Sequence, residues 1–110
     1  MAKLESPING RFHEVKSRIY HGVISGSISC ELNGESNFVG RNSRCSVMVF
    51  ERYSAFGGNR VSLSVTLYQD GDGPIHMSAI ASGGSQAIFA KINTFSEESF
   101  LEKLREVLAE

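Results

Sequence analysis

One segment alternates apolar and small polar residues with a period of two, and this pattern constrains the fold more than any other. Residues 60–68 carry apolar side chains at every second position and hydroxyl side chains between them: Val61, Leu63, Val65 and Leu67 against Ser62, Ser64 and Thr66. Successive side chains of a strand point to opposite faces, so the segment predicts a β-strand with one buried face. The apolar face of such a sheet needs a second layer to cover it.

Short connectors that favour turns flank this strand. Gly57-Gly58-Asn59 precedes it, and Asp70-Gly71-Asp72-Gly73-Pro74 follows it. Beyond the connectors, residues 45–50 and 75–81 are rich in side chains that favour strands. Because the connectors are short and their residues tolerate positive φ, neighbouring strands should pair as antiparallel hairpins.

Two other stretches have apolar residues at helical spacing. In residues 11–23 these residues recur every three or four positions: Phe12, Val15, Ile19 and Val23. Near the other end, Thr94 and Glu97 form a capping-box pattern before a second apolar stripe. That stripe consists of Phe100, Leu101, Leu104, Val107 and Leu108. The two amphipathic helices are available to cover the apolar face of the sheet.

Two further strands complete the predicted order. One is expected over residues 3–8, and another over residues 27–32, ending at a turn at Asn33-Gly34. The result is an α+β fold with the order β-α-β-β-β-β-α, in which an N-terminal and a C-terminal helix cover a curved antiparallel sheet. For residues 86–92 the sequence is compatible with either an extra strand or an irregular crossing segment. Without repeats or Pro-rich linkers, residues 1–110 predict a single domain.

Composition argues against several partners. A net charge of −1 lacks the basic excess typical of proteins that bind nucleic acid, so no nucleic-acid partner is expected. No segment approaches the roughly 20 apolar residues of a membrane span, and the charged N-terminus does not resemble a signal peptide. Cys30 and Cys45 are too few for a disulfide framework. We therefore expect a cytoplasmic protein with two reduced thiols.

No pattern assembles catalytic or metal chemistry. His13 and His21 lie on the first predicted helix about 12 Å apart by helical rise, too far to share a metal ion. No local motif orders Cys30, Cys45 or His76 into a nucleophile–base pair. We therefore predict no metal, no cofactor and a binding protein rather than an enzyme.

The densest unusual segment predicts a ligand-binding rim. Arg52, Tyr53, Phe56 and Arg60 place two guanidinium groups and two aromatic rings around one hairpin end. Arginine and aromatic side chains are enriched at binding hot spots because they combine large contact areas with directional hydrogen-bond donors. These four residues are the candidate binding site.

The sequence also resembles a known family. The run FERYSAFGGNRVSLSV from Phe50 to Val65 and the run SGGSQ from Ser82 are similar to those of a small bacterial family known only as a domain of unknown function. The resemblance covers nearly the whole chain and implies a bacterial single-domain protein, without implying an activity. The element order resembles the helix-grip architecture of the START domains and one repeat of the TATA-binding-protein fold, which implies a sheet wrapped around the C-terminal helix.

Three functions follow as competing hypotheses. The first is a non-catalytic module that binds a small, partly apolar ligand between the sheet and the C-terminal helix, in a cavity lined by Val49, Val61, Leu63 and Met77. The second is a protein-interaction or homo-oligomer module, such as a homodimer, that uses a strand edge or the aromatic-Arg hairpin. The third is a small enzyme of helix-grip type, for which the sequence indicates no catalytic residue.

Overall fold

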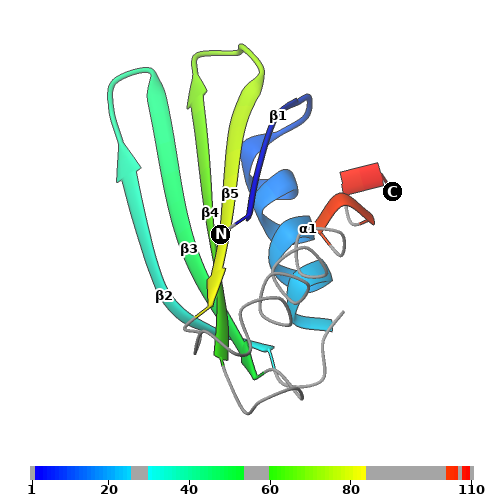
Figure 1. Cartoon of the computed structure of the whole chain (residues 1–110). Helices are drawn as coiled ribbons and strands as arrows, with labels where there is room; N and C mark the ends of the chain where they lie inside the picture. Colours follow the sequence, from blue (N-terminus) through cyan, green and yellow to red (C-terminus); the bar gives the residue numbers. More distant parts are fainter. Residues whose placement is uncertain (1, 26–29, 54–59, 84–103, 107, 110) are drawn as a thin grey trace.

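A five-stranded antiparallel sheet forms the centre of the protein (Figure 1). The computed structural model describes residues 2–25, 30–53, 60–83, 104–106 and 108–109. Its elements are β1 (Ala2–Ile8), α1 (Phe12–Ser25), β2 (Cys30–Val39), β3 (Ser43–Tyr53), β4 (Arg60–Asp70) and β5 (Ile75–Gly83). Residues 104–106 and 108–109 are helical. The predicted α+β class and element order are confirmed.

The strand order explains why α1 lies where it does. The strands run β1-β5-β4-β3-β2, so that β2 to β5 form a meander and β1 pairs with the last strand. As a result β1 and β2 are consecutive in the chain but occupy opposite edges of the sheet. The connection between them must therefore cross the sheet, and α1 makes that crossing on one face (Figure 1). We call this the helix face, and the opposite side the outer face.

The core lies between the helix face and the helical segments. The predicted apolar stripe of α1 is buried, at most 5% exposed. The sheet contributes Met48, Phe50, Val61, Leu63, Val65, Leu67, Ile75, Met77, Ala79 and Ala81. Leu104 is also fully buried in this cluster, and the C-terminal helical residues lie on the same side of the sheet as α1 (Figure 1). Each large aliphatic side chain buried here contributes about 1.5–3 kcal/mol to folding.

The predicted turn at Asn33-Gly34 is wrong, because β2 continues through it to Val39. Leu32 pairs with Phe50, whereas Gly34 pairs with the preceding residue of β3, so Asn33 is an extra residue that forms a β-bulge. The bulge reverses the alternation of side chains along β2. Beyond it, Glu35 and Asn37 are on the helix face, where regular alternation from Leu32 would not place them.

Several predictions fall on residues that the structure does not describe. They concern the first three residues of the predicted strand 27–32, the connector 57–59, the open segment 86–92 and the capping box at 94–97. Of the second predicted helix, Leu104 and Leu108 do pack against the core. Within the described ranges, no helix combines the length and apolar character needed to cross a membrane.

Two glycines should respond in opposite ways to substitution by alanine. Gly34 has no positive φ, and a Cβ there would meet nothing within 4 Å, so Gly34→Ala should stabilise the protein by about 0.5 kcal/mol. Gly10 has φ 137°, and its Cβ would lie 3.2 Å from Val15 Cγ2, so Gly10→Ala should destabilise it by about 1–2 kcal/mol. Urea unfolding of both variants tests the pair, and a loss at Gly34 as large as that at Gly10 would contradict the bulge geometry.

Candidate functional site

The structure places the two arginines of the predicted binding rim on opposite faces of the sheet. Arg52 pairs with Val61 on the helix face and is half-buried, and burial lowers the pKa of its guanidinium. Arg60 is exposed on the outer face, where its Nη1 lies 2.8 Å from Glu51 Oε1 and 3.9 Å from Glu31 Oε1. Arg60 is thus engaged in surface ion pairs.

The other two residues of the rim are not described at side-chain level. The backbone of Tyr53 ends β3, but its side chain lies outside the described part of the protein, as does the whole of Phe56. The proposed rim therefore stays a prediction. Its two described members, Arg52 and Arg60, would reach one ligand only around the end of the sheet.

Of the four residues predicted to line a cavity under the C-terminal helix, one lies on the other face of the sheet. Val61, Leu63 and Met77 are buried on the helix face, at most 2% exposed. Val49 pairs with Ser64 on the outer face, so it cannot line the same cavity. Residues 94–103 of the predicted C-terminal helix lie outside the described ranges, and the cavity beneath that helix stays a prediction.

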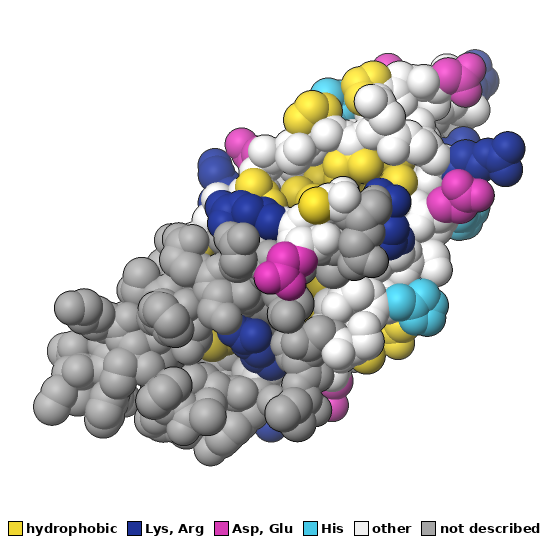
Figure 2. Space-filling model, turned by 90° about the vertical axis from the view of Figure 1, so that its right-hand side faces the viewer, with side chains coloured by type: hydrophobic (Ala, Val, Ile, Leu, Met, Phe, Trp, Pro, Cys, Tyr) yellow, Lys and Arg dark blue, Asp and Glu magenta, His cyan; other side chains and the backbone are white. Residues whose placement is uncertain are grey.

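A different pocket lies between the beginning of α1 and the β2–β3 hairpin. Its volume is about 520 Å³. Phe12 and Val39 contribute apolar surface, and the nitrogen-bearing side chains in its lining are His13, Lys16, Asn37, Arg41, Asn42 and Arg44. Among the described residues, no Asp or Glu lines it. Seen from the helix side, Lys and Arg side chains flank a band of hydrophobic side chains (Figure 2).

Arg44 is oriented by an aromatic ring at the start of α1. Its guanidinium carbon lies 5.7 Å from the centre of the Phe12 ring, within the range of a cation–π interaction. Phe12 itself is 5% exposed and belongs to the core, so the ring is a fixed support. Arg44 is exposed, and across the strands it pairs with Val39 and Gln69. The pocket therefore contains a positioned guanidinium beside apolar surface.

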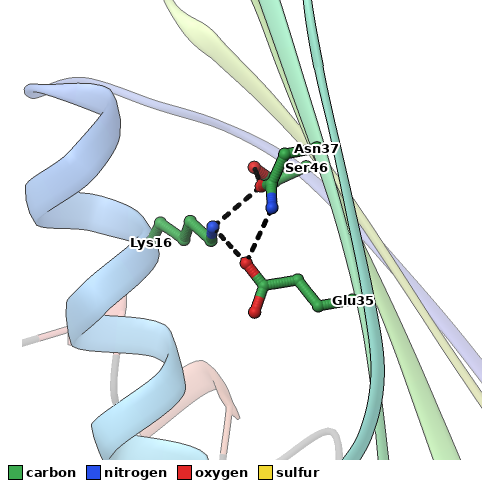
Figure 3. A network of polar contacts seen from close by, with 4 residues as sticks. All are labelled: Lys16, Glu35, Asn37 and Ser46. Carbon is green, nitrogen blue, oxygen red and sulfur yellow. Dashed lines mark hydrogen bonds and ion pairs between the residues drawn. The ribbon is translucent and has the colours of Figure 1, made fainter.

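A polar network joins α1 to the edge strand next to this pocket (Figure 3). Lys16 forms an ion pair with Glu35, and its Nζ also donates to Asn37 Oδ1 at 2.8 Å. The Nδ2 of Asn37 donates to Glu35 Oε2 at 3.0 Å. Ser46, which is only 2% exposed, donates its hydroxyl to Asn37 Oδ1 at 2.6 Å. The network satisfies a buried hydroxyl and fixes the helix against β2.

The network makes part of the stability depend on pH. Hydrogen bonds from Lys16, and then from Asn37, lower the pKa of Glu35 below its ordinary value of 4.5. Since the folded-state pKa is the lower one, this stabilisation is complete above the ordinary value and disappears as the pH falls through the folded-state pKa. Glu35→Gln should therefore cost about 0.5–1 kcal/mol at pH 7, and the difference from wild type should decrease as the pH falls below 4.5 and disappear below the folded-state pKa of Glu35.

Urea unfolding at a series of pH values measures this difference. Glu5→Gln is the matched control, because Glu5 is exposed and lies 3.8 Å from Lys3 on the outer face. If wild type remained more stable than Glu35→Gln by the same free energy of unfolding in acid, the stabilisation would not come from the charged Glu35 carboxylate.

The remaining reactive side chains do not form a second site among the described residues. Cys30 and Cys45 are free thiols, and burial raises the pKa of Cys30, an effect that Arg52 opposes. His76 stacks with Tyr68 on the outer face, with ring centres 6.5 Å apart. Within the described ranges, no three His, Cys, Asp or Glu side chains are grouped so that they could hold a metal ion.

Comparison with known proteins identifies the family of this chain but indicates no activity. No curated protein matched the chain, and no solved structure matched it. A family model did match, and the match runs over residues 1–110. The chain therefore belongs to the Family of unknown function (DUF6054).

Proposed function

We propose that this protein is a non-catalytic module that binds a small, partly apolar anion in the pocket between α1 and the β2–β3 hairpin. The observation that supports this function is the lining of the pocket, in which cationic side chains adjoin apolar surface and no described carboxylate is present. This proposal keeps the ligand class expected from the sequence and adds a negative charge. It moves the site from the C-terminal helix to α1.

The size and charge of the pocket support this ligand. A volume of about 520 Å³ is within the range of small-molecule sites. Glu35 neutralises Lys16, and among the described residues no carboxylate forms an ion pair with Arg41 or Arg44, the two permanent charges that remain in the lining. A guanidinium binds carboxylate, sulfonate or phosphate oxygens through paired N–H donors. Phe12 and Val39 offer contact to an apolar group on the same ligand.

A fluorescent anion tests the proposal directly. The probe is 1-anilinonaphthalene-8-sulfonate, and N-phenyl-1-naphthylamine is its neutral counterpart. We expect saturable binding of the sulfonate at one site, weakened about tenfold by Arg44→Ser because a charge-assisted contact is lost. Binding of the neutral probe should change much less. The matched control is Arg18→Ser, which removes an exposed arginine of α1 outside the pocket.

Two results would reject the proposed function. One is a wild-type protein that binds the sulfonate without saturation. The other is an equal loss of affinity in Arg44→Ser and Arg18→Ser, which would indicate attraction by overall charge. Native mass spectrometry of protein purified gently from its natural host adds an independent measurement, because a retained mass that is lost on denaturation identifies the natural ligand.

The proposal also includes three features inferred from the sequence: the architecture, the cellular compartment and the bacterial origin. The β1-β5-β4-β3-β2 order, with α1 and the C-terminal helical residues on one face, supports a helix-grip-like or TATA-binding-protein-like architecture. Two free thiols support a reducing compartment such as the cytoplasm. A bacterial origin rests on the sequence resemblance alone.

An interaction module is the second candidate function. Its supporting observation is the β2 edge, where residues 33–40 are exposed. Unpaired backbone groups on such an edge can accept another strand. An added peptide would extend the sheet beyond β2, and Ser36→Pro should then remove its binding without affecting the sulfonate probe.

A further inference from the structure

The outer face of the sheet is uncharged at its centre. Across β3, β4 and β5 its central side chains are apolar or carry hydroxyl groups: Val47, Val49, Ser64, Thr66, Ser78 and Ile80. Charged residues lie only around this area. Lys3 and Glu5 are on the β1 edge, and Glu31, Glu51 and Arg60 are at one end. An uncharged centre with a charged rim is the usual composition of a protein interface.

The described helical segments leave this face uncovered. Both α1 and the C-terminal helical residues lie on the other side of the sheet (Figure 1). Phe38 is 63% exposed and Tyr68 is 42% exposed, and both belong to one row that crosses the sheet. The pairing register sets the members of this row as Phe38, Cys45, Tyr68, His76 and Pro7. One end of the face therefore presents aromatic and imidazole side chains.

The strand edges are less suited than the face to pairing with the edge of a second copy of this chain. On β1, Pro7 lacks an N–H donor, and Lys3 and Glu5 place charges on the edge. On β2, the bulge after Leu32 interrupts the regular spacing of backbone groups, and Glu35 is held by Lys16. Charges, proline and bulges are the means by which edge strands avoid pairing edge to edge with another copy of the same sheet.

The area of the face is sufficient for a dimer. Five strands about 4.8 Å apart and four rows of side chains about 6.8 Å apart cover about 24 Å by 27 Å, or roughly 650 Å². Stable interfaces bury about 600–1,000 Å² per partner. The net charge of −1 adds little repulsion between two copies.

The side chains along β4 fit a two-fold arrangement. On the outer face they increase in size along the strand, in the order Ser62, Ser64, Thr66 and Tyr68. A two-fold axis across the strands would reverse this order in the second copy. Tyr68 of one copy would then lie over the serines of β4 in the other, so that large side chains meet small ones on both sides of the axis.

We propose that the outer face binds a second copy of this chain, forming a two-fold dimer of two sheets packed face to face. The occupant is a second copy because the face is complementary to itself in size and carries no central charge that would repel its own kind. The inference concerns the face opposite the pocket, so it does not depend on the proposed ligand.

Sedimentation equilibrium at protein concentrations from about 1 to about 500 µM tests the dimer. Wild type should dimerise within this range. Ser64→Glu places a charge at the centre of the interface in both copies and should weaken dimerisation about tenfold or more. Tyr68→Ser, at a side chain that is 42% exposed, should also weaken it without threatening the fold. The matched control is Ser17→Glu, which adds the same charge on the exposed side of α1.

The predicted geometry is tested by cross-linking. In a background of Cys30→Ser and Cys45→Ser, mixing Tyr68→Cys with Ser64→Cys should give a disulfide-linked heterodimer under mild oxidation. A monomeric wild type at the highest concentration would overturn the proposal. So would a dimer unaffected by both Ser64→Glu and Tyr68→Ser. In either case sulfonate binding by the pocket would still be measured separately, so failure of the dimer is distinguishable from failure of the ligand site.

Discussion

Replacing Phe50 with alanine should lower the free energy of unfolding by about 3–5 kcal/mol, the range measured for buried Phe→Ala changes. Phe50 is fully buried on β3, between its cross-strand neighbours Leu32 and Leu63. The ring of Tyr20 on α1 lies 6.3 Å away, centre to centre, so the same side chain also contacts the helix layer. Truncation would remove this contact and leave a cavity between helix and sheet, which the surrounding structure can close only in part.

Urea unfolding followed by circular dichroism measures this loss. The matched control is Phe38→Ala, because Phe38 is on the neighbouring strand but is 63% exposed. It should lose less than about 0.5 kcal/mol, as surface substitutions usually do. Low protein concentration keeps the outer face free of any partner in both experiments. Equal losses at the two positions would mean that Phe50 does not lie in the core.

The sequence predicted well the elements whose periodicity was strong. Val61, Leu63, Val65 and Leu67 lie in the core of the structure, as their alternation indicated. The stripe of α1 was equally clear, since apolar spacings of three and four residues do not fit a strand. In both cases the physical cause is local, because the burial of one face is expressed in consecutive residues.

The path of β2 could not be predicted in this way. Asn33-Gly34 is a strong hairpin signal when its local preference is considered alone. In the structure the partner strand β3 continues beyond this point and keeps β2 extended as far as Val39. The non-local hydrogen bonds therefore override the local turn preference, and Asn33 is accommodated as a bulge.

The candidate pocket required this longer strand. Glu35 and Asn37 reach Lys16 only because the bulge places them on the helix face. Arg41 and Arg44 join the same pocket because the hairpin brings its turn beside the start of α1. Nothing in the sequence of residues 40–42 indicates that they would lie beside α1.

The predicted binding rim shows that closeness in sequence does not decide whether two residues share one face of a sheet. Arg52 and Arg60 are close in sequence and near one end of the sheet, which suggested a common site. The register pairs Arg52 with Val61 and Tyr53 with Arg60, so the two arginines differ by one position and face opposite ways. A shift of one residue decides the face of a strand side chain, and turn length alone does not determine it.

The second large effect is expected at Leu104, where the C-terminal helical residues meet the core. Leu104→Ala should lower the free energy of unfolding by about 2–5 kcal/mol, because Leu104 is fully buried in the same cluster as the residues of α1 and the sheet. Leu108→Ala is the matched control: Leu108 is only partly buried against that cluster and should lose clearly less. Urea unfolding followed by circular dichroism should give one transition for both variants, since a helix packed into the shared core unfolds together with the sheet. A loss below about 1 kcal/mol at Leu104, or a separate early transition in wild type, would instead show that the C-terminal segment contributes little to the common core.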